Sequence, residues 1–255
     1  MRTQKLNILL VALFLIPFAL LQAQESKNQA FYVHEDQVKP SMIQEYEKIS
    51  KEFTETCKKH NLQDVSWQVA ATDTGRYLNI SPMENFADLD TNYFAPLMEK
   101  MGEKAFGDMF KSFDACYDKH GDYIVYLNNE LTYMPDGIST ITEGEDYRKW
   151  HFLYVTPENI QNLKGKLKEL KALFEKKGSK EYYRIYHNGF GNMGDYYVAV
   201  LSAKDAGDYA KKSKENDALL GEEGKKLFGE MMKYVSKYET ETGGMRPELA
   251  YSPSK

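Results

Sequence analysis

The chain has 255 residues, of which 42% are hydrophobic and 28% are charged, a composition close to that of ordinary globular domains. It carries 33 Lys and Arg against 38 Asp and Glu. Because no basic excess is available to neutralise phosphates, we expect no nucleic-acid partner. Length and composition also exclude a collagen, a disordered tail, a multi-span membrane protein and a disulfide-rich mini-protein.

The N-terminus has the layout of a secretory signal peptide. Arg2 and Lys5 precede an apolar run at 6–21, and Ala23 offers a small residue for cleavage. The run is interrupted and shorter than the ~20 residues that span a bilayer. We therefore predict a signal peptide at 1–23, export to a periplasm or the medium, and no stable membrane span after cleavage.

The remaining chain resembles itself. The segment ELTYMP at 130–135 recurs as ELAYSP at 248–253. Apolar residues also recur at i, i+4, i+7 and i+11, the spacing of one helix face. They are Met42, Tyr46, Ile49 and Phe53 in the first copy and Leu163, Leu167, Leu170 and Phe174 in the second. These matches predict two repeats, at 29–135 and 150–253, joined by a polar linker at 136–149.

Each repeat shows the same order of expected elements. In the first repeat we expect strands at 31–34, 67–70, 77–80 and 123–133, and helices at 40–60 and around 97–116. In the second we expect strands at 150–155, 182–187, 196–201 and 249–251, and helices at 157–177 and within 203–238. Ser81 and Glu84 have the form of a capping box for the second helix of the first repeat, and Ser202 with Asp205 matches it in the second.

The order β-α-β-β-α-β is the ferredoxin-like motif, whose sheet has one face covered by helices and one bare face. Two tandem copies can cover each other's bare face. The predicted fold class is therefore α+β, with two ferredoxin-like repeats packed as a pseudo-dimer within one chain. In this order, and in the segments 31–60 and 150–177, the chain resembles the dimeric α+β barrel superfamily. That group includes antibiotic-biosynthesis monooxygenase-like, stress-responsive barrel, NIPSNAP-like and chlorite-dismutase-like proteins, and the resemblance implies an intramolecular barrel.

Two short motifs are typical of other chemistries, but their contexts favour turns. The run 189–194 spells GxGxxG, yet a strand rather than a helix is expected after it, so a hairpin loop is favoured over a phosphate site. The triplet 73–75 spells DTG, but the second such carboxylate that an aspartic protease needs is missing.

Two cysteines and two histidines lie near expected helix ends, as Cys57 with His60 and Cys116 with His120. The spacing is compatible with a zinc site, and an exported protein could instead pair the cysteines. Antiparallel helices would place the two cysteines at opposite edges of the sheet, beyond the reach of a disulfide. Both cysteines also extend apolar stripes. We therefore favour packed free thiols and predict no metal site.

Polar and aromatic side chains on expected strands are the candidate ligand-binding residues. One face of each strand meets helices and the other lines the barrel interior, where a few polar groups could orient a ligand in an apolar pocket. The candidates are His34, Trp67, Asn79, His151, Tyr183, Arg184 and His187. A strand end where His and Arg reach water is the alternative.

Three functions remain open. The first is an exported protein that binds a partly apolar small molecule between the two sheets. The second, implied by the resemblance, is a cofactor-independent monooxygenase-like or haem-using enzyme, with His34, His151 or His187 as base or haem ligand; haem is possible but not required by the sequence. The third is a structural or interaction module with a filled barrel.

Overall fold

Eight antiparallel strands close into a barrel in the computed structural model of the chain, which describes residues 28–253. The strand order around the barrel is β1-β3-β2-β8-β5-β7-β6-β4. Each half of the chain thus contributes four neighbouring strands in the ferredoxin-like arrangement, and the predicted α+β pseudo-dimer is confirmed. The predicted signal peptide lies outside the described residues.

The two halves contain equivalent elements in the same order. The first half comprises β1 (Gln29–Val38), η1 (Pro40–Met42), α3 (Ile43–Lys59), β2 (Gln68–Thr72), β3 (Arg76–Met83), η2 (Phe86–Asp90), α4 (Ala95–Met101), α5 (Glu103–Lys111) and β4 (Tyr117–Leu127). The second half comprises β5 (Tyr147–Val155), η3 (Pro157–Asn159), α6 (Ile160–Lys177), β6 (Tyr183–Asn188), β7 (Asp195–Ala203), α7 (Ala206–Met232), β8 (Lys237–Met245) and η4 (Pro247–Leu249).

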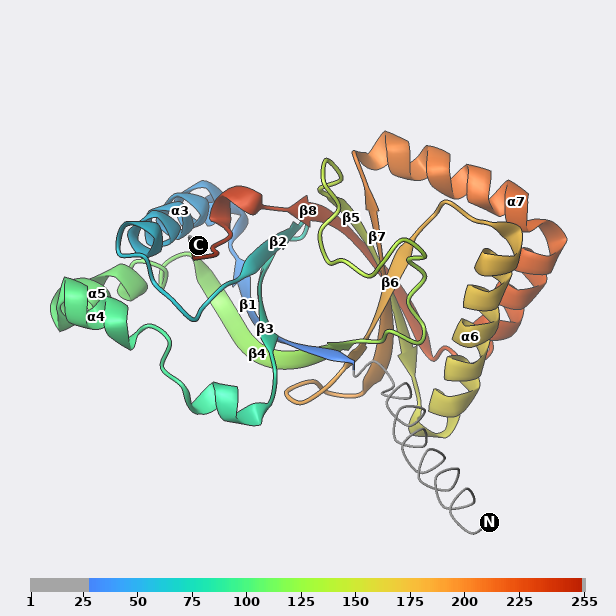
Figure 1. Cartoon of the computed structure of the whole chain (residues 1–255), viewed down its shortest axis with the longest axis horizontal. Helices are drawn as coiled ribbons and strands as arrows, with labels where there is room; N and C mark the ends of the chain where they lie inside the picture. Colours follow the sequence, from blue (N-terminus) through green and yellow to red (C-terminus); the bar gives the residue numbers. More distant parts are fainter. Residues whose placement is uncertain (1–27, 254–255) are drawn as a thin grey trace, which may run out of the picture.

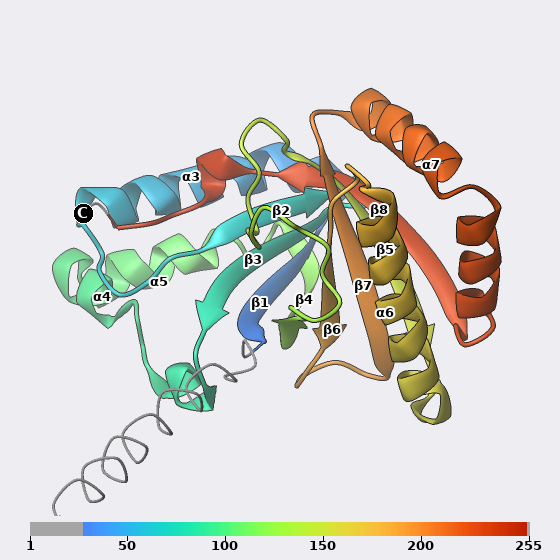
Figure 2. The same cartoon turned by 45° about the vertical axis from the view of Figure 1, so that its right-hand side comes forward.

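The helices lie outside the barrel, on two opposite sides. Figures 1 and 2 show α3, α4 and α5 beside the strands of the first half, and α6 and α7 beside those of the second. The predicted apolar helix faces are confirmed. Tyr46 and Ile49 belong to the core beneath α3, and Leu163 and Leu167 belong to the core beneath α6. Within residues 28–253, no helix is long and apolar enough to cross a membrane.

The last strand of the second half differs from the prediction. The sequence placed a helix up to residue 238 and the final strand at 249–251, whereas β8 occupies Lys237–Met245. Its residues are mostly charged or small because it is half-exposed, so it lacks the apolar alternation that reveals a strand. β8 pairs with β2 and β5 and so joins the two halves.

The predicted helix caps are also wrong in position. Ser202 lies within β7 rather than at a helix start, and its hydroxyl accepts a hydrogen bond from Arg184. The caps are Asn85, which precedes η2, and Asp205, which precedes α7. Asp205 Oδ1 accepts from the backbone N–H of Asp208 at 2.8 Å, as an N-cap residue does. Both halves therefore have a helix cap at this point, but the capping residues are Asn85 and Asp205 instead of Ser81 and Ser202.

The segment that follows the last strand of each half packs against the other half. The predicted strand at 123–133 ends at Leu127, and Tyr133 forms a β-bridge with Tyr183 in the second half. Tyr251, its counterpart, forms a bridge with Trp67 in the first half. This reciprocal exchange explains why ELTYMP and ELAYSP recur: each supplies apolar side chains to the core of the opposite half.

Cys57 and Cys116 are free and buried in the core of the first half. Burial raises the pKa of the Cys57 thiol to about 12, and it also raises the pKa of Cys116. Both side chains serve as small apolar groups in this core.

Candidate functional site

The inner face of the barrel surrounds a cavity of about 570 Å³. Alternate residues of each strand point inward, as Phe31, Val33 and Glu35 do from β1. An eight-stranded barrel is just wide enough to be filled by side chains or to hold one small ligand. The volume lies within the roughly 300–1,000 Å³ of small-molecule sites, so this barrel has room for a ligand.

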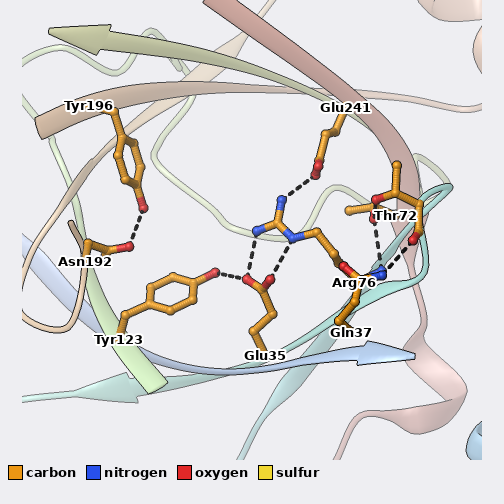
Figure 3. A network of polar contacts seen from close by, with 9 residues as sticks. Glu35, Gln37, Thr72, Arg76, Tyr123, Asn192, Tyr196 and Glu241 are labelled. Carbon is orange, nitrogen blue, oxygen red and sulfur yellow. Dashed lines mark hydrogen bonds and ion pairs between the residues drawn. The ribbon is translucent and has the colours of Figure 1, made fainter. Parts of the chain in front are cut away.

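A charged network that includes Glu35, Arg76 and Tyr123 lines part of this cavity, and its contacts are shown in Figure 3. The Arg76 guanidinium donates to both oxygens of Glu35, with Nε–Oε1 at 2.7 Å and Nη2–Oε2 at 2.8 Å. Its Nη1 donates to Glu241 Oε2 at 2.7 Å, and the Tyr123 hydroxyl donates to Glu35 Oε2 at 2.7 Å. Arg76 is thus shared by carboxylates from β1 and β8, the strands of two different halves.

The protonation states of this network follow from burial and charge. Burial raises the pKa of Glu35, but the hydrogen bonds and charge of Arg76 outweigh it and hold that pKa below the ordinary value. Burial, reinforced by the charge of Glu35, keeps the pKa of Tyr123 well above its ordinary value. At neutral pH Glu35 is therefore ionised and Tyr123 is a neutral phenol. Arg76 contacts both Glu35 and Glu241, so two carboxylates share one guanidinium.

Two further arginines line the opposite part of the cavity, Arg148 on β5 and Arg184 on β6, each only 2% exposed. Arg148 Nη1 donates to the carbonyls of Glu145 and, at 3.1 Å, Tyr147. Arg184 donates to the Ser139 carbonyl and, at 2.8 Å, to the Ser202 hydroxyl. These contacts attach the segment between the two halves to this end of the barrel.

Arg148 and Arg184 lack a carboxylate partner among residues 28–253: all their hydrogen-bond acceptors are carbonyl or hydroxyl oxygens. Burial, followed by the positive charge of Arg184, lowers the pKa of Arg148 to about 10. Burial also lowers the pKa of Arg184. Since an unpaired buried charge is costly, this end of the cavity favours an anion.

Apolar side chains lie next to both polar groups of the cavity. Arg148 and Tyr154 share the inner face of β5 and are six residues apart, about 20 Å along a strand. Trp150 and Phe152 lie between them, and the strand register places Val200 opposite Trp150. The cavity therefore combines a cationic part, an apolar part and a mixed charged part, and Trp150 of the apolar part is paired with Glu241 of the charged network.

A second cavity, of about 840 Å³, lies between the outer face of the first half's sheet and its helices. Its polar wall includes His34 and Asp36 from β1 and Asn79 from β3. Its aromatic lining consists mainly of Phe53, Trp67, Phe94, Phe110 and Phe113. This cavity therefore combines an aromatic group with polar residues, which come from the sheet and from the segments 63–66 and 88–92.

His34 is held between two carboxylates at this wall. Its Nδ1 lies 2.8 Å from Asp122 Oδ1, and its Nε2 lies 3.3 Å from Asp36 Oδ1. The contact with Asp36, opposed by burial and assisted by Asp122, raises the pKa of His34 to about 9. The imidazole is therefore protonated at neutral pH when only these carboxylates bind it, which disfavours it as a general base.

The structure distributes the seven sequence candidates over three places. Arg184 alone lines the barrel interior. His34, Trp67 and Asn79 face the second cavity instead. His151, Tyr183 and His187 lie on the outer face of the second half's sheet. Tyr183 belongs to the core beneath α6.

The other two candidate histidines, His151 and His187, both contact tyrosines. His151 contacts the hydroxyls of Tyr238 at 2.5 Å and Tyr209 at 3.2 Å. Burial, with a contribution from Lys149, lowers its pKa to about 4. His187 stacks on Tyr126 with ring centroids 5.2 Å apart. Neither histidine lines one of the two cavities.

These three histidines do not fit haem. Axial ligation requires a ring nitrogen that points into open space beside the porphyrin. Both ring nitrogens of His151 contact tyrosine hydroxyls. The ring of His187 stacks on Tyr126, and its Nδ1 is buried rather than open to a ligand. For His34, the Asp36 carboxylate 3.3 Å from Nε2 occupies the position that the porphyrin plane would take. We therefore derive no haem-dependent step.

The two short motifs form turns, as predicted. Residues 189–194 connect β6 to β7, and the loop pairs with β4: Gly189 N–H donates to the Ile124 carbonyl at 2.8 Å. Residues 73–75 connect β2 to β3, with Gly75 in the positive-φ region at φ +83°.

Sequence reasoning missed most of the barrel's charged residues, Glu35, Arg76, Arg148 and Glu241. They are polar residues within strands, as Arg184 is, and that shared signal could have marked them. Their inward direction depends on strand register, and a one-residue error reverses it. Glu241 was missed because β8 was not recognised as a strand.

No protein family and no curated protein matches the chain in sequence comparisons. Solved structures do match. An anthrone oxidase-like protein is 14% identical, with a TM-score of 0.58, covering 87% of this chain and 92% of its own. A monooxygenase-annotated protein of Fusobacterium nucleatum is 11% identical, with a TM-score of 0.56 and coverage of 86% and 93%. A mutant chlorite dismutase from Candidatus Nitrospira defluvii is 8% identical, with a TM-score of 0.50 and coverage of 86% and 92%. At these identities the likeness shows the fold alone.

Proposed function

The chain has the dimeric α+β barrel fold as an intramolecular pseudo-dimer, and we propose that the interior of this barrel binds an elongated, mainly apolar organic anion. The observation that carries the proposal is the pair Arg148 and Arg184, two buried guanidinium groups that line the cavity without a carboxylate partner. A ligand carboxylate or sulfonate would supply the missing charge, and charge-assisted hydrogen bonds to arginine are strong and well directed.

The rest of the cavity defines the ligand's other end. Trp150 and Phe152 would contact an apolar chain or ring system beyond the arginines. The Arg76 network has two carboxylates for one guanidinium, so it disfavours a second anionic group and favours a neutral polar group there. The open volume argues against a barrel filled by its own side chains.

The test uses a matched pair of ligands, dodecanoate and dodecanol, which differ in the charged head. Trp150 lines the barrel, and Trp67 is the other of the two tryptophans, so Trp67→Phe leaves a single reporter of the cavity. We expect dodecanoate to change Trp150 fluorescence and to bind at least ten times more tightly than dodecanol.

Arg148→Met with Arg184→Met should remove this preference, since a hydrogen bond to a charged group contributes about 1.5–3 kcal/mol. Lys149→Met is the matched control. Lys149 is next to Arg148 on β5, but its side chain points to the outer face and donates to Thr240 Oγ1 at 2.9 Å. Equal binding of the two ligands, or a preference that survives the double substitution, would contradict the proposal.

The fold neighbours support a second function, an oxidative enzyme that uses the second cavity. The specific observation is His34, held by two carboxylates at the wall of an aromatic-lined space. The anthrone oxidase-like neighbour suggests anthrone as a trial substrate, with oxidation followed by absorbance under air. Activity lost in His34→Gln and kept in His60→Gln would support this function, and no turnover of anthrone would count against it.

We further propose that the protein acts after export, on the strength of the N-terminal pattern at 1–23. N-terminal sequencing of the protein from the native exported fraction should give Gln24 as the first residue. Recovery of the intact chain with Met1 from a cytoplasmic fraction would contradict export.

A further inference from the structure

Two histidines and two carboxylates form a square on the outer face of the first half's sheet. His34 and Asp36 lie on β1, and His120 and Asp122 lie opposite them on β4, with Asp36 paired to His120 in the strand register. Within residues 28–253, one group gathers metal-binding atoms closely: one ligand atom each from His34, Asp36 and His120, all within 4.8 Å of one another. The sequence prediction of no metal site did not anticipate this arrangement.

His34 and Asp36 are each held in place by a contact through one side-chain atom, which leaves a second atom for a metal ion. Nδ1 of His34 lies 2.8 Å from Asp122 Oδ1, so its Nε2 remains as the ligand atom. Tyr46 donates its hydroxyl to Asp36 Oδ2 at 2.7 Å, so Oδ1 remains as the ligand atom. Carboxylates behind a ligating histidine, and hydrogen bonds to a ligating carboxylate, are what hold the ligands of known metal sites in position.

The remaining carboxylate oxygen, Oδ1 of Asp36, has the ion-pair contact with His34 as its one polar contact within residues 28–253. Asp36 is only 4% exposed, and its Oδ1 is buried without a hydrogen-bond partner. It lies 3.3 Å from His34 Nε2. Two donor atoms bound to one ion at about 2.0–2.2 Å are separated by roughly 3.0–3.6 Å at tetrahedral or octahedral angles. The two atoms are therefore already spaced as ligands of a common ion.

We propose that His34, Asp36 and His120 bind one divalent first-row transition-metal ion, with Asp122 and Tyr46 as positioning residues. Two imidazoles and one carboxylate suit zinc, iron or cobalt, whereas calcium and magnesium prefer oxygen ligands alone. His120 is exposed, so its ring can turn to complete the set. Three protein ligands leave a position open for water or a substrate, and His34 and Asp36 place the ion beside the second cavity.

This site is independent of the barrel ligand proposed above. His34 and Asp36 line the second cavity. His120 also borders the barrel cavity, but neither Arg148 nor Arg184 belongs to the ligand group. Loss of metal binding and loss of dodecanoate binding can therefore be measured separately in the same variants.

The experiment titrates the mature protein, stripped with EDTA, with Co²⁺ and Zn²⁺. Calorimetry should give one ion per chain, and bound Co²⁺ should give a visible absorption spectrum. His120→Ala should weaken binding at least tenfold and change that spectrum, and as an exposed position it should not impair folding. Asp122→Asn should weaken binding about 10–100-fold, as loss of a partner to a ligating histidine does, without removing the site.

His60→Ala is the matched control, because His60 lies at the end of α3 and belongs to no ligand group. It should leave both the stoichiometry and the Co²⁺ spectrum unchanged. Asp36→Asn tests the buried ligand, with thermal unfolding to check that the variant folds. The proposal is overturned if the stripped protein binds no ion, if His120→Ala binds Co²⁺ like the parent, or if His60→Ala loses binding to the same extent.

Discussion

Tyr133 and Tyr251 occupy equivalent positions in the two halves, and each donates its hydroxyl to the opposite half. Tyr251 donates to the Leu62 carbonyl at 2.6 Å, and Tyr133 donates to the Ser179 carbonyl at 2.9 Å. Both rings are buried in the core of the half that they join. The two tyrosines thus connect the repeats at two symmetric points outside the sheet.

We predict that Tyr251→Phe and Tyr133→Phe each lower the free energy of unfolding by about 1–2 kcal/mol. The substitution keeps the ring but leaves a buried carbonyl without its donor. Urea denaturation measures the change. Tyr93→Phe is the control, because the Tyr93 hydroxyl has no hydrogen bond to any residue of 28–253; a loss of the same size there would show that the exchange bonds are unimportant.

The Arg76 network leads to a second prediction. Arg76→Met leaves Glu35 and Glu241 as two half-buried carboxylates without their cation. We expect the free energy of unfolding to fall by about 2–3 kcal/mol, somewhat below the cost of breaking a fully buried pair. The cost arises from unpaired charge rather than from a lost attraction.

The triple variant that adds Glu35→Gln and Glu241→Gln to Arg76→Met separates these causes. It should recover most of the lost stability in the same urea experiment, since neutral side chains need no cation. If the triple variant is no more stable than Arg76→Met alone, the network stabilises the barrel through its geometry and not through charge balance.

The halves were predictable from the sequence because helix faces and repeated segments are local signals. Leu163, Leu167 and Leu170 recur with helical spacing whatever they pack against. The exchange of Tyr133 and Tyr251 was not predictable, because ELTYMP and ELAYSP show that a segment is repeated but not which half it joins.

The candidate sites were predicted only in part, for a different reason. Arg184 lines the barrel cavity, whereas His151 and His187 face the helices. Successive strand residues point to opposite faces of the sheet. Without the strand register, the sequence alone therefore cannot show whether Arg184 or His187 faces the barrel interior. The ligand set His34, Asp36 and His120 also required the pairing of β1 with β4, which only the folded sheet supplies.

The glycine loop at 189–194 offers a matched pair for a third prediction. Gly191 and Gly194 both have positive φ, at +90° and +78°. A Cβ on Gly191 would lie 2.6 Å from the Asp122 carbonyl oxygen, whereas one on Gly194 would meet nothing within 4 Å. Gly194→Ala should cost about 1 kcal/mol from backbone strain alone. Gly191→Ala should cost clearly more in thermal unfolding, because β4 must also move. Equal losses would mean that the loop adjusts freely against β4.

The pH dependence of stability provides the fourth prediction, through Glu181. Asn216 Nδ2 donates to its Oε2 at 2.8 Å, while Oε1 is buried without a partner. Burial, reinforced by the charge of Asp217, raises the pKa of Glu181 from 4.5 to about 7. The folded state therefore favours the protonated carboxyl. Its contribution to stability is complete below pH 4.5, falls as the pH rises through about 7, and is absent above that.

The size of this contribution is on the order of 3 kcal/mol, since each pKa unit corresponds to about 1.4 kcal/mol. Glu181→Gln cannot ionise, so its stability relative to the parent should increase by this amount between pH 4.5 and pH 8. Urea denaturation of both proteins at each pH measures the difference in their free energies of unfolding. The contributions of other groups that titrate in both proteins cancel in this difference. Glu175→Gln, at an exposed carboxylate on α6, should give no such change. A difference between Glu181→Gln and the parent that is constant with pH would mean that Glu181 is ionised in the folded protein throughout this range.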